Sequence, residues 1–199
     1  MSEEMLVCHC SPTLAGLKTG SLFSCPYSSQ KMIIKEIREF NQKLTQKGIR
    51  IIPVRISDKR MLVYVYRPEK LKEDFSDEKT QIILKCKGYD CTNLSQCICR
   101  LIQKLQSDPD FPHEIGLFLG YPAEDVKGFI ENKAACSKCS GCWKVYGDEQ
   151  EAKSIFEKYN VCSKIYFQQW KQGKSIEQLA VADGCFCGNQ SETIINLDG

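Results

Sequence analysis

Cysteines and histidines are the residues of this chain best suited to chemistry. The sequence contains 13 cysteines but only two histidines, His9 and His113. A cysteine becomes a nucleophile when a nearby imidazole or a helix N-terminus lowers the pKa of its thiol. We therefore pair Cys10 with His113 as candidate nucleophile and base. Glu114 or Asp148 would orient the imidazole, and His9 is adjacent to the nucleophile. The alternative is that Cys10 is a buried, unreactive thiol.

A second candidate site consists of three equally spaced cysteines, Cys136, Cys139 and Cys142. Three thiolates at this spacing can hold an iron–sulfur cluster or fill three zinc positions. The candidates for the fourth ligand are cysteines later in the chain: Cys162, Cys185 and Cys187. The pattern thus predicts zinc or an iron–sulfur cluster as cofactor. The alternative is a loop that carries three thiols facing solvent.

Composition limits the classes of function. The 27 basic and 25 acidic residues give a net charge of +2, so no broad positive surface for nucleic acid or an anionic membrane is expected. The acidic start of the chain does not read as a signal peptide, and we expect no membrane span because no apolar run has the necessary length. An odd number of cysteines without an export signal indicates reduced thiols. We expect a cytoplasmic protein, and the thiol content favours an anaerobic or strongly reducing cell.

The elements that would position these residues follow from the apolar pattern. Residues 49–56 and 61–66 predict an antiparallel hairpin, whereas 28–47, 93–106 and 149–172 predict amphipathic helices. Because strands and helices alternate irregularly around this hairpin, we expect one α+β domain over residues 1–182. Its sheet would be mostly antiparallel, with four to five strands and flanking helices. Residues 183–199, which include two cysteines, read as a flexible tail.

The surroundings of the candidate catalytic residues are also predicted. Ser11-Pro12 reads as a helix start, which places Cys10 just before a helix over residues 13–23. The apolar run 115–120 reads as a strand with His113 at its start, and 143–146 reads as another strand. On this basis His9, Cys10 and His113 should converge at one end of the sheet.

Three segments carry a family resemblance. Residues 9–20, 111–132 and 141–148 resemble an uncharacterised family of anaerobic bacteria, domain of unknown function 3793, and the likeness extends over about residues 5–182. The resemblance implies redox or metal physiology, with flavodoxin as a candidate redox partner. It brings no activity with it.

Three hypotheses of function follow. The first is a cytosolic, cysteine-dependent enzyme of anaerobic redox or metal metabolism that acts through Cys10 and His113. The second is a zinc or iron–sulfur protein that binds its metal through Cys136, Cys139 and Cys142. The third is a non-catalytic adaptor whose thiols have no role.

Overall fold

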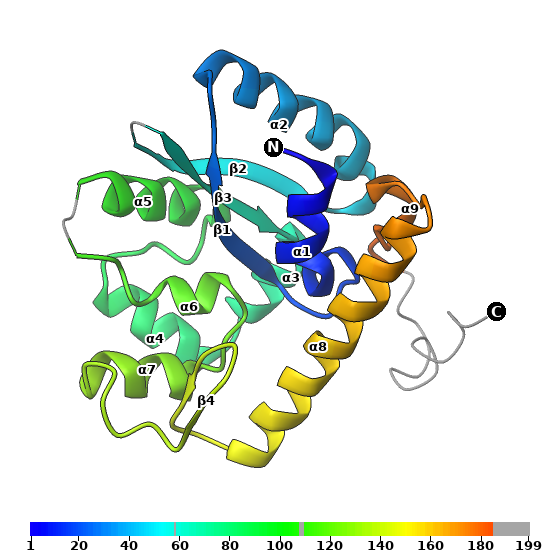
Figure 1. The fold of residues 1–199 in the computed structure, drawn as a ribbon. Helices are drawn as coiled ribbons and strands as arrows, with labels where there is room; N and C mark the ends of the chain where they lie inside the picture. Colours follow the sequence, from blue (N-terminus) through cyan, green and yellow to red (C-terminus); the bar gives the residue numbers. More distant parts are fainter. Residues whose placement is uncertain (58, 108–109, 185–199) are drawn as a thin grey trace.

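The computed structural model describes residues 1–57, 59–107 and 110–184, and within them the chain forms a mixed arrangement of helices and strands (Figure 1). In chain order the elements are α1 (Glu3–Leu14), β1 (Gly20–Pro26), α2 (Gln30–Leu44), the 3-10 helix η1 (Thr45–Lys47), β2 (Arg50–Ile56), β3 (Arg60–Tyr66), α3 (Pro68–Asp74), α4 (Glu78–Cys86), α5 (Leu94–Ser107), α6 (Ile115–Phe118), α7 (Ala123–Glu131), β4 (Cys139–Ser140), β5 (Lys144–Val145), α8 (Glu149–Lys171) and α9 (Ile176–Leu179).

The central sheet has three antiparallel strands in the order β1-β3-β2. Tyr66 of β3 lies opposite Gly20 of β1 and Arg50 of β2, which fixes the register of both pairs. β4 and β5 form a separate two-stranded hairpin. The antiparallel hairpin predicted over residues 49–66 is therefore present. Within the described residues the predicted sheet of four to five strands is wrong, because β4 and β5 pair with each other instead of joining the central sheet.

The sheet separates two hydrophobic clusters. Side chains of a strand alternate between its faces, and on β3 Val63 and Val65 join one cluster while Tyr64 and Tyr66 join the other. The first cluster is covered by α1, α2 and α8, and the second by α3 to α7. Figure 1 shows the corresponding arrangement, with α1 and α8 on one side of the strands and α4 to α7 on the other.

The start of the chain is a helix, α1, which precedes the position where the sequence predicts a first helix. Ser2 caps α1 by accepting a hydrogen bond from the Met5 amide, and Glu3 and Glu4 follow in the first turn, where acidic side chains suit the helix dipole. Pro12 lies in the last turn of α1 rather than at a helix start. The predicted helix over residues 13–23 is therefore wrong, and most of that segment is a loop and β1.

The apolar run after His113 is the other misassigned segment. It forms the short helix α6, whose four residues are all buried, instead of a strand. An apolar run of this length fits either a buried strand or a buried helix turn, and periodicity cannot distinguish them. The turn at Pro112 to Glu114 starts the helix, since the Ile115 and Leu117 amides bond back to Pro112 and Glu114 carbonyls.

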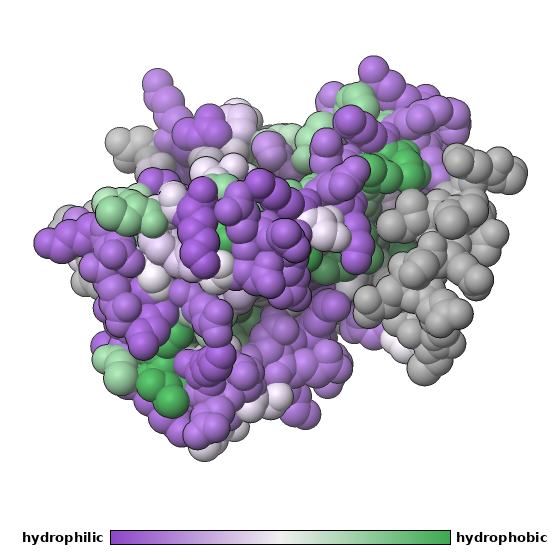
Figure 2. All heavy atoms as spheres, turned by 90° about the horizontal axis from the view of Figure 1, so that it is seen from below, coloured by the Kyte–Doolittle hydropathy of each residue, from purple (hydrophilic) through white to green (hydrophobic). Residues whose placement is uncertain are grey.

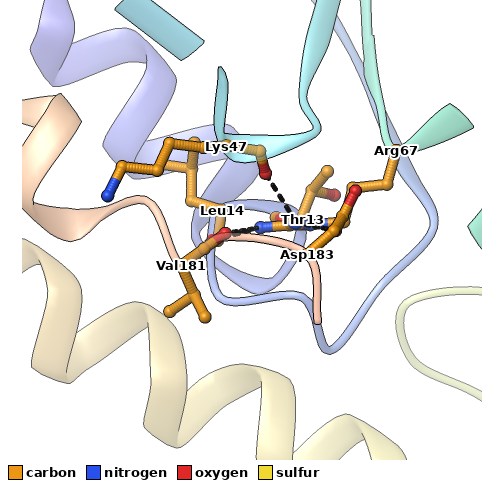
Figure 3. A network of polar contacts seen from close by, with 6 residues as sticks. All are labelled: Thr13, Leu14, Lys47, Arg67, Val181 and Asp183. Atoms are coloured by element: carbon orange, nitrogen blue, oxygen red, sulfur yellow. Dashed lines mark hydrogen bonds and ion pairs between the residues drawn. The ribbon is translucent and has the colours of Figure 1, made fainter. Parts of the chain in front are cut away.

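A buried arginine joins the two ends of the described chain (Figure 3). The guanidinium of Arg67, which is 1% exposed, donates to the backbone carbonyls of Thr13, Leu14 and Val181 at 2.7 Å each. It also donates to the Lys47 carbonyl at 3.2 Å and pairs with the Asp183 carboxylate at 2.5 Å. The expected boundary between domain and tail at residue 182 falls inside this network, and residues 185–199 of the expected tail lie outside the described residues.

The surface seen from below is mainly hydrophilic, with separate spots of exposed hydrophobic atoms (Figure 2). Within the described residues, no helix has the combined length and apolarity that crossing a membrane requires.

Candidate active site

Lys18 lines a cleft together with several side chains that can take part in polar chemistry. After α1 the chain turns sharply, because the Leu17 and Lys18 amides both donate to the Pro12 carbonyl and Gly16 has a φ of +75°. This turn directs the Lys18 side chain between two aromatic rings. Its ammonium nitrogen lies 5.2 Å from the ring centroid of Tyr121 and 5.9 Å from that of Tyr159. Both distances are within the range of a cation–π interaction.

The cleft in front of Lys18 has a volume of about 580 Å³. It is open to solvent and is lined by residues of α1, the start of β1, the β4–β5 hairpin and α8. The lining residues with side chains able to take part in polar chemistry are His9, Lys18, Ser21, Cys142, Glu157, Tyr159, Asn160 and Ser163. His9 and Cys142, which the sequence assigned to two different sites, thus share one cleft.

Cys142 is positioned by the packing of its hairpin. Gly141 approaches α8 so closely that a Cβ atom there would lie 2.3 Å from the ring of Phe156. The next residue but one, Trp143, stacks on Tyr121 at 4.8 Å and meets Phe156 edge-on at 4.5 Å. The Tyr121 hydroxyl donates to the Cys142 carbonyl at 3.2 Å. Cys142 is therefore held between two packed positions while its own side chain stays exposed.

A buried carboxylate fixes the hairpin from the other side. Asp125 of α7 accepts the indole N–H of Trp143 at 2.6 Å and the backbone amides of Tyr146 and Gly147 at 2.7 Å each. Charged acceptors form stronger hydrogen bonds than neutral ones, so this single side chain joins α7 to the strand that follows Cys142.

The electrostatics of the cleft couple Lys18 to Cys142. Burial lowers the pKa of Lys18, and the thiols of Cys142 and Cys10 oppose that shift. Burial raises the pKa of Cys142, and the Lys18 ammonium opposes it. Burial thus disfavours the charged form of each group, whereas the charge of either group favours the opposite charge on the other. Among the residues that the structure describes, the Lys18 ammonium has no hydrogen-bond or ion-pair partner, so its charge is not neutralised by the protein there.

Cys10 does not have the surroundings predicted for a nucleophile. It lies within α1 instead of before a helix, and it is fully buried in the first hydrophobic cluster. Burial raises the pKa of its thiol strongly, against weaker opposing effects of Lys18 and Ser21. Because the Cys10 side chain is fully buried, a substrate in solution cannot reach its sulfur.

His113 lies on the other side of the sheet from Cys10, since the helix it precedes packs into the second cluster. It is exposed, meets the ring of Phe129 edge-on at 5.0 Å, and lines a separate, mainly apolar cavity of about 300 Å³. The expectation that Cys10 and His113 converge at one end of the sheet is therefore wrong. The two opposed clusters keep them apart.

The two carboxylates expected to orient a histidine have other partners. Glu114 is buried and accepts hydrogen bonds from Lys104 at 2.6 Å and from the Tyr89 hydroxyl at 3.1 Å. Asp148 caps α8, where it accepts from the Gln150 and Glu151 amides.

The four cysteines predicted to bind a metal are dispersed. Cys136 and Cys142 are exposed, Cys139 is half-buried in β4, and Cys162 is buried in α8, where burial raises its pKa to about 12. Within residues 1–57, 59–107 and 110–184, no three His, Cys, Asp or Glu side chains are close enough to share a metal ion. The other predicted ligands, Cys185 and Cys187, lie outside the described residues. The positions of these side chains give the predicted zinc or iron–sulfur site no support.

Sequence reasoning missed Lys18 and Tyr159. Both were assigned to helices, and neither belongs to a spacing pattern that signals a site. The one available signal was that the segment of residues 9–20, which carries part of the family resemblance, contains a single lysine. Tyr159 joins the cleft only because α8 packs along α1, a contact between residues about 140 positions apart in the chain.

These features define a mixed helix-and-sheet protein whose cleft carries a cysteine, a lysine and a histidine. Comparison with protein families shows that the chain belongs to the family DUF3793. The family model matches residues 6–180 and is described as a protein of unknown function. The resemblance stated from the three sequence segments is thereby confirmed. No curated protein and no solved structure matches the chain.

Proposed function

We propose that the protein is a cytoplasmic thiol-dependent enzyme with Cys142 as its nucleophile and Lys18 as the cation that stabilises the thiolate. One observation carries the proposal: the half-buried Lys18 ammonium faces the same cleft as the Cys142 thiol and has no anionic partner among the described residues. All eleven cysteines in this part of the chain carry free thiols, which accords with a reducing compartment.

Cys142 becomes negatively charged when it loses its proton. A thiolate in a partly desolvated cleft is unfavourable, and a nearby ammonium offsets that cost. Lys18 is fixed between two aromatic rings, so little reorganisation is needed when the thiolate forms. His9, which lines the same cleft, is the candidate base, since a neutral imidazole can accept the thiol proton directly or through one water.

The proposal transfers the enzyme hypothesis from Cys10 to Cys142 and keeps its class of chemistry. Cys10 then has a structural role, as a small apolar side chain in the core. The adaptor hypothesis predicts instead that Lys18 does not affect the reactivity of Cys142, because a thiol without a role needs no cation beside it.

The test compares alkylation of Cys142 in the wild type and in Lys18→Met. Neutral iodoacetamide is added at pH 7.5 under anaerobic conditions, and peptide mass spectrometry follows each cysteine separately. A nearby opposite charge, within about 4–6 Å, shifts a pKa by about one unit or more. We therefore expect Cys142 to react about tenfold more slowly in Lys18→Met.

Cys136 is the matched control, since it is exposed and belongs to the same segment. Its rate should be the same in both proteins. A Cys142 rate that does not change on loss of Lys18, or that falls together with the Cys136 rate, would favour the adaptor hypothesis over a thiol enzyme.

A further inference from the structure

The first step toward the ligand of this cleft is the unbalanced charge of Lys18. Its ammonium has three N–H donors, and the rings of Tyr121 and Tyr159 attract the charge without accepting directed hydrogen bonds. In the described part of the chain no carboxylate or carbonyl accepts from it. The donors therefore stay available on the side where Lys18 lines the cleft, and an anion bound there would offset the cost of a partly buried, unpaired charge.

The number of charged residues in the cleft indicates which kind of anion it would bind. Lys18 is the only lysine or arginine that lines the cleft in the described structure, and one acidic residue, Glu157, lines it as well. A phosphate dianion would meet one cation and the repulsion of that carboxylate. A carboxylate carries a single charge, which one ammonium can balance. The remaining groups around it, the Asn160 amide and the His9 imidazole, can donate uncharged hydrogen bonds.

The third step is the position of Cys142 relative to this charge. Cys142 and Lys18 line one cleft of about 580 Å³, which falls within the range of small-molecule sites. An acid bound to Lys18 would have its uncharged end within reach of the thiol. Binding of the charged end would convert attack by Cys142 into a reaction within one complex, with a corresponding gain in rate.

We infer that the substrate of this cleft is a small carboxylic acid, bound through its carboxylate at Lys18 and attacked at a neighbouring electrophilic atom by Cys142. The inference deepens the proposed function and rests on it. The recognition element is the ammonium between the two tyrosine rings, and the reacting element is the thiol.

Iodoacetate is a direct probe, because it joins a carboxylate to an electrophilic carbon. The Cys142 sulfur forms a bond to that carbon, the carbon–iodine bond breaks, and iodide leaves with the electron pair. The thiol proton passes to a base of the cleft or to buffer. Iodoacetamide undergoes the same substitution with a neutral amide in place of the carboxylate.

The experiment measures the ratio of the iodoacetate rate to the iodoacetamide rate at each cysteine of the intact protein. A charge-assisted contact favours the anion by about tenfold or more, so the ratio at Cys142 should exceed that at Cys136 by about this factor. The preference should disappear in Lys18→Met and in 1 M salt, and it should persist in Lys18→Arg, which keeps the charge. If Lys18→Met does not fold, the salt dependence and Lys18→Arg still decide the question.

The two proposals fail in different ways. If Cys142 is inert to both reagents, the proposed thiol function is wrong. If Cys142 reacts readily with iodoacetamide but shows the same ratio as Cys136, the thiol function stands and the carboxylate site is wrong. If millimolar inorganic phosphate suppresses the reaction with iodoacetate while acetate does not, the site prefers phosphate esters and the assignment to a carboxylic acid is overturned.

Discussion

The behaviour of each thiol in this protein depends on what surrounds its sulfur. The charge of Lys18 acts to lower the pKa of both Cys10 and Cys142, but the two thiols differ in their exposure to solvent. Cys10 is sealed within the first hydrophobic cluster, whereas Cys142 is exposed at a cleft. The same ammonium can therefore support chemistry at one thiol and not at the other.

Glu114 illustrates a residue whose role is structural and sensitive to pH. Burial alone would raise its pKa, but hydrogen bonds from Lys104 and Tyr89 outweigh burial, and the net pKa is lowered. A carboxylate with a lowered folded-state pKa adds stability that is complete above its unfolded value of about 4.3 and is lost as the pH falls through the folded value. Glu114→Gln should therefore lower the stability by about 3 kcal/mol at pH 7, because it leaves Lys104 largely buried without a counter-charge.

Urea unfolding at pH 7 and at pH 3 measures this effect. The difference between the wild type and Glu114→Gln should shrink as the wild-type carboxylate becomes protonated. Glu131→Gln is the control, since Glu131 pairs with Lys127 on an exposed helix surface and should change stability by less than about 0.5 kcal/mol. Equal effects of the two substitutions at pH 7 would contradict the prediction.

At the scale of elements, long periodic segments could be predicted and short buried ones could not. The amphipathic helices α2, α5 and α8 and the β2–β3 hairpin lie close to their predicted ranges. The segment that became α6 has no amphipathic period, since all its residues are buried, and its helical state depends on the packing around it. The cleft could not be predicted for a similar reason: Lys18, Cys142 and Tyr159 come together only through the packing of distant elements.

The hairpin that carries Cys142 should depend on one carboxylate of α7. Asp125→Ala would leave the indole N–H of Trp143 and two backbone amides without their acceptor, at a cost of about 1–3 kcal/mol for each buried donor. We expect β4 and β5 to open locally before the central sheet unfolds. Hydrogen exchange should show faster exchange at Tyr146 and Gly147, with little change in β1 to β3.

Asp110→Ala provides the comparison for a substitution of the same type away from the hairpin, and it should leave exchange at Tyr146 unchanged. If Asp125→Ala exchanges like the wild type in this hairpin, the carboxylate does not hold it. In that case aromatic packing of Trp143 against Tyr121 and Phe156 would be sufficient.

At the scale of the whole molecule, the central sheet separates the chemically reactive side chains as well as the two hydrophobic clusters. The Lys18 cleft is built on α1 and α8, which cover one face, whereas His113 and Glu114 precede a helix on the other face. Sequence spacing carries no information about which face a distant residue will occupy. For this reason the predicted pairing of Cys10 with His113 could not be checked from sequence spacing, and the structure places the two residues on opposite faces of the sheet.

Arg67 connects the beginning and the end of the described chain, and this leads to a prediction about the whole molecule. A chain that ends at residue 180, where the family match ends, loses the Val181 carbonyl and the Asp183 carboxylate from the Arg67 network. The guanidinium is 1% exposed while this segment is present, and truncation leaves it with two fewer acceptors. We expect this truncated chain to lose about 3 kcal/mol of stability and to melt about 8 °C lower.

A chain that ends at residue 184 keeps every described contact of Arg67 and should melt within about 2 °C of the full-length protein. A double-mutant cycle identifies the cause. In an Arg67→Met background no guanidinium remains that could lose its acceptors. Truncation at residue 180 should therefore lower the stability by less than half as much as it does in the wild type. Equal melting temperatures for the chains that end at 180 and at 184 would show that Val181 and Asp183 do not stabilise the fold through Arg67. An undiminished cost in the Arg67→Met background would assign the effect to other contacts of this segment, such as the hydrogen bond from the Val181 amide to the Leu14 carbonyl.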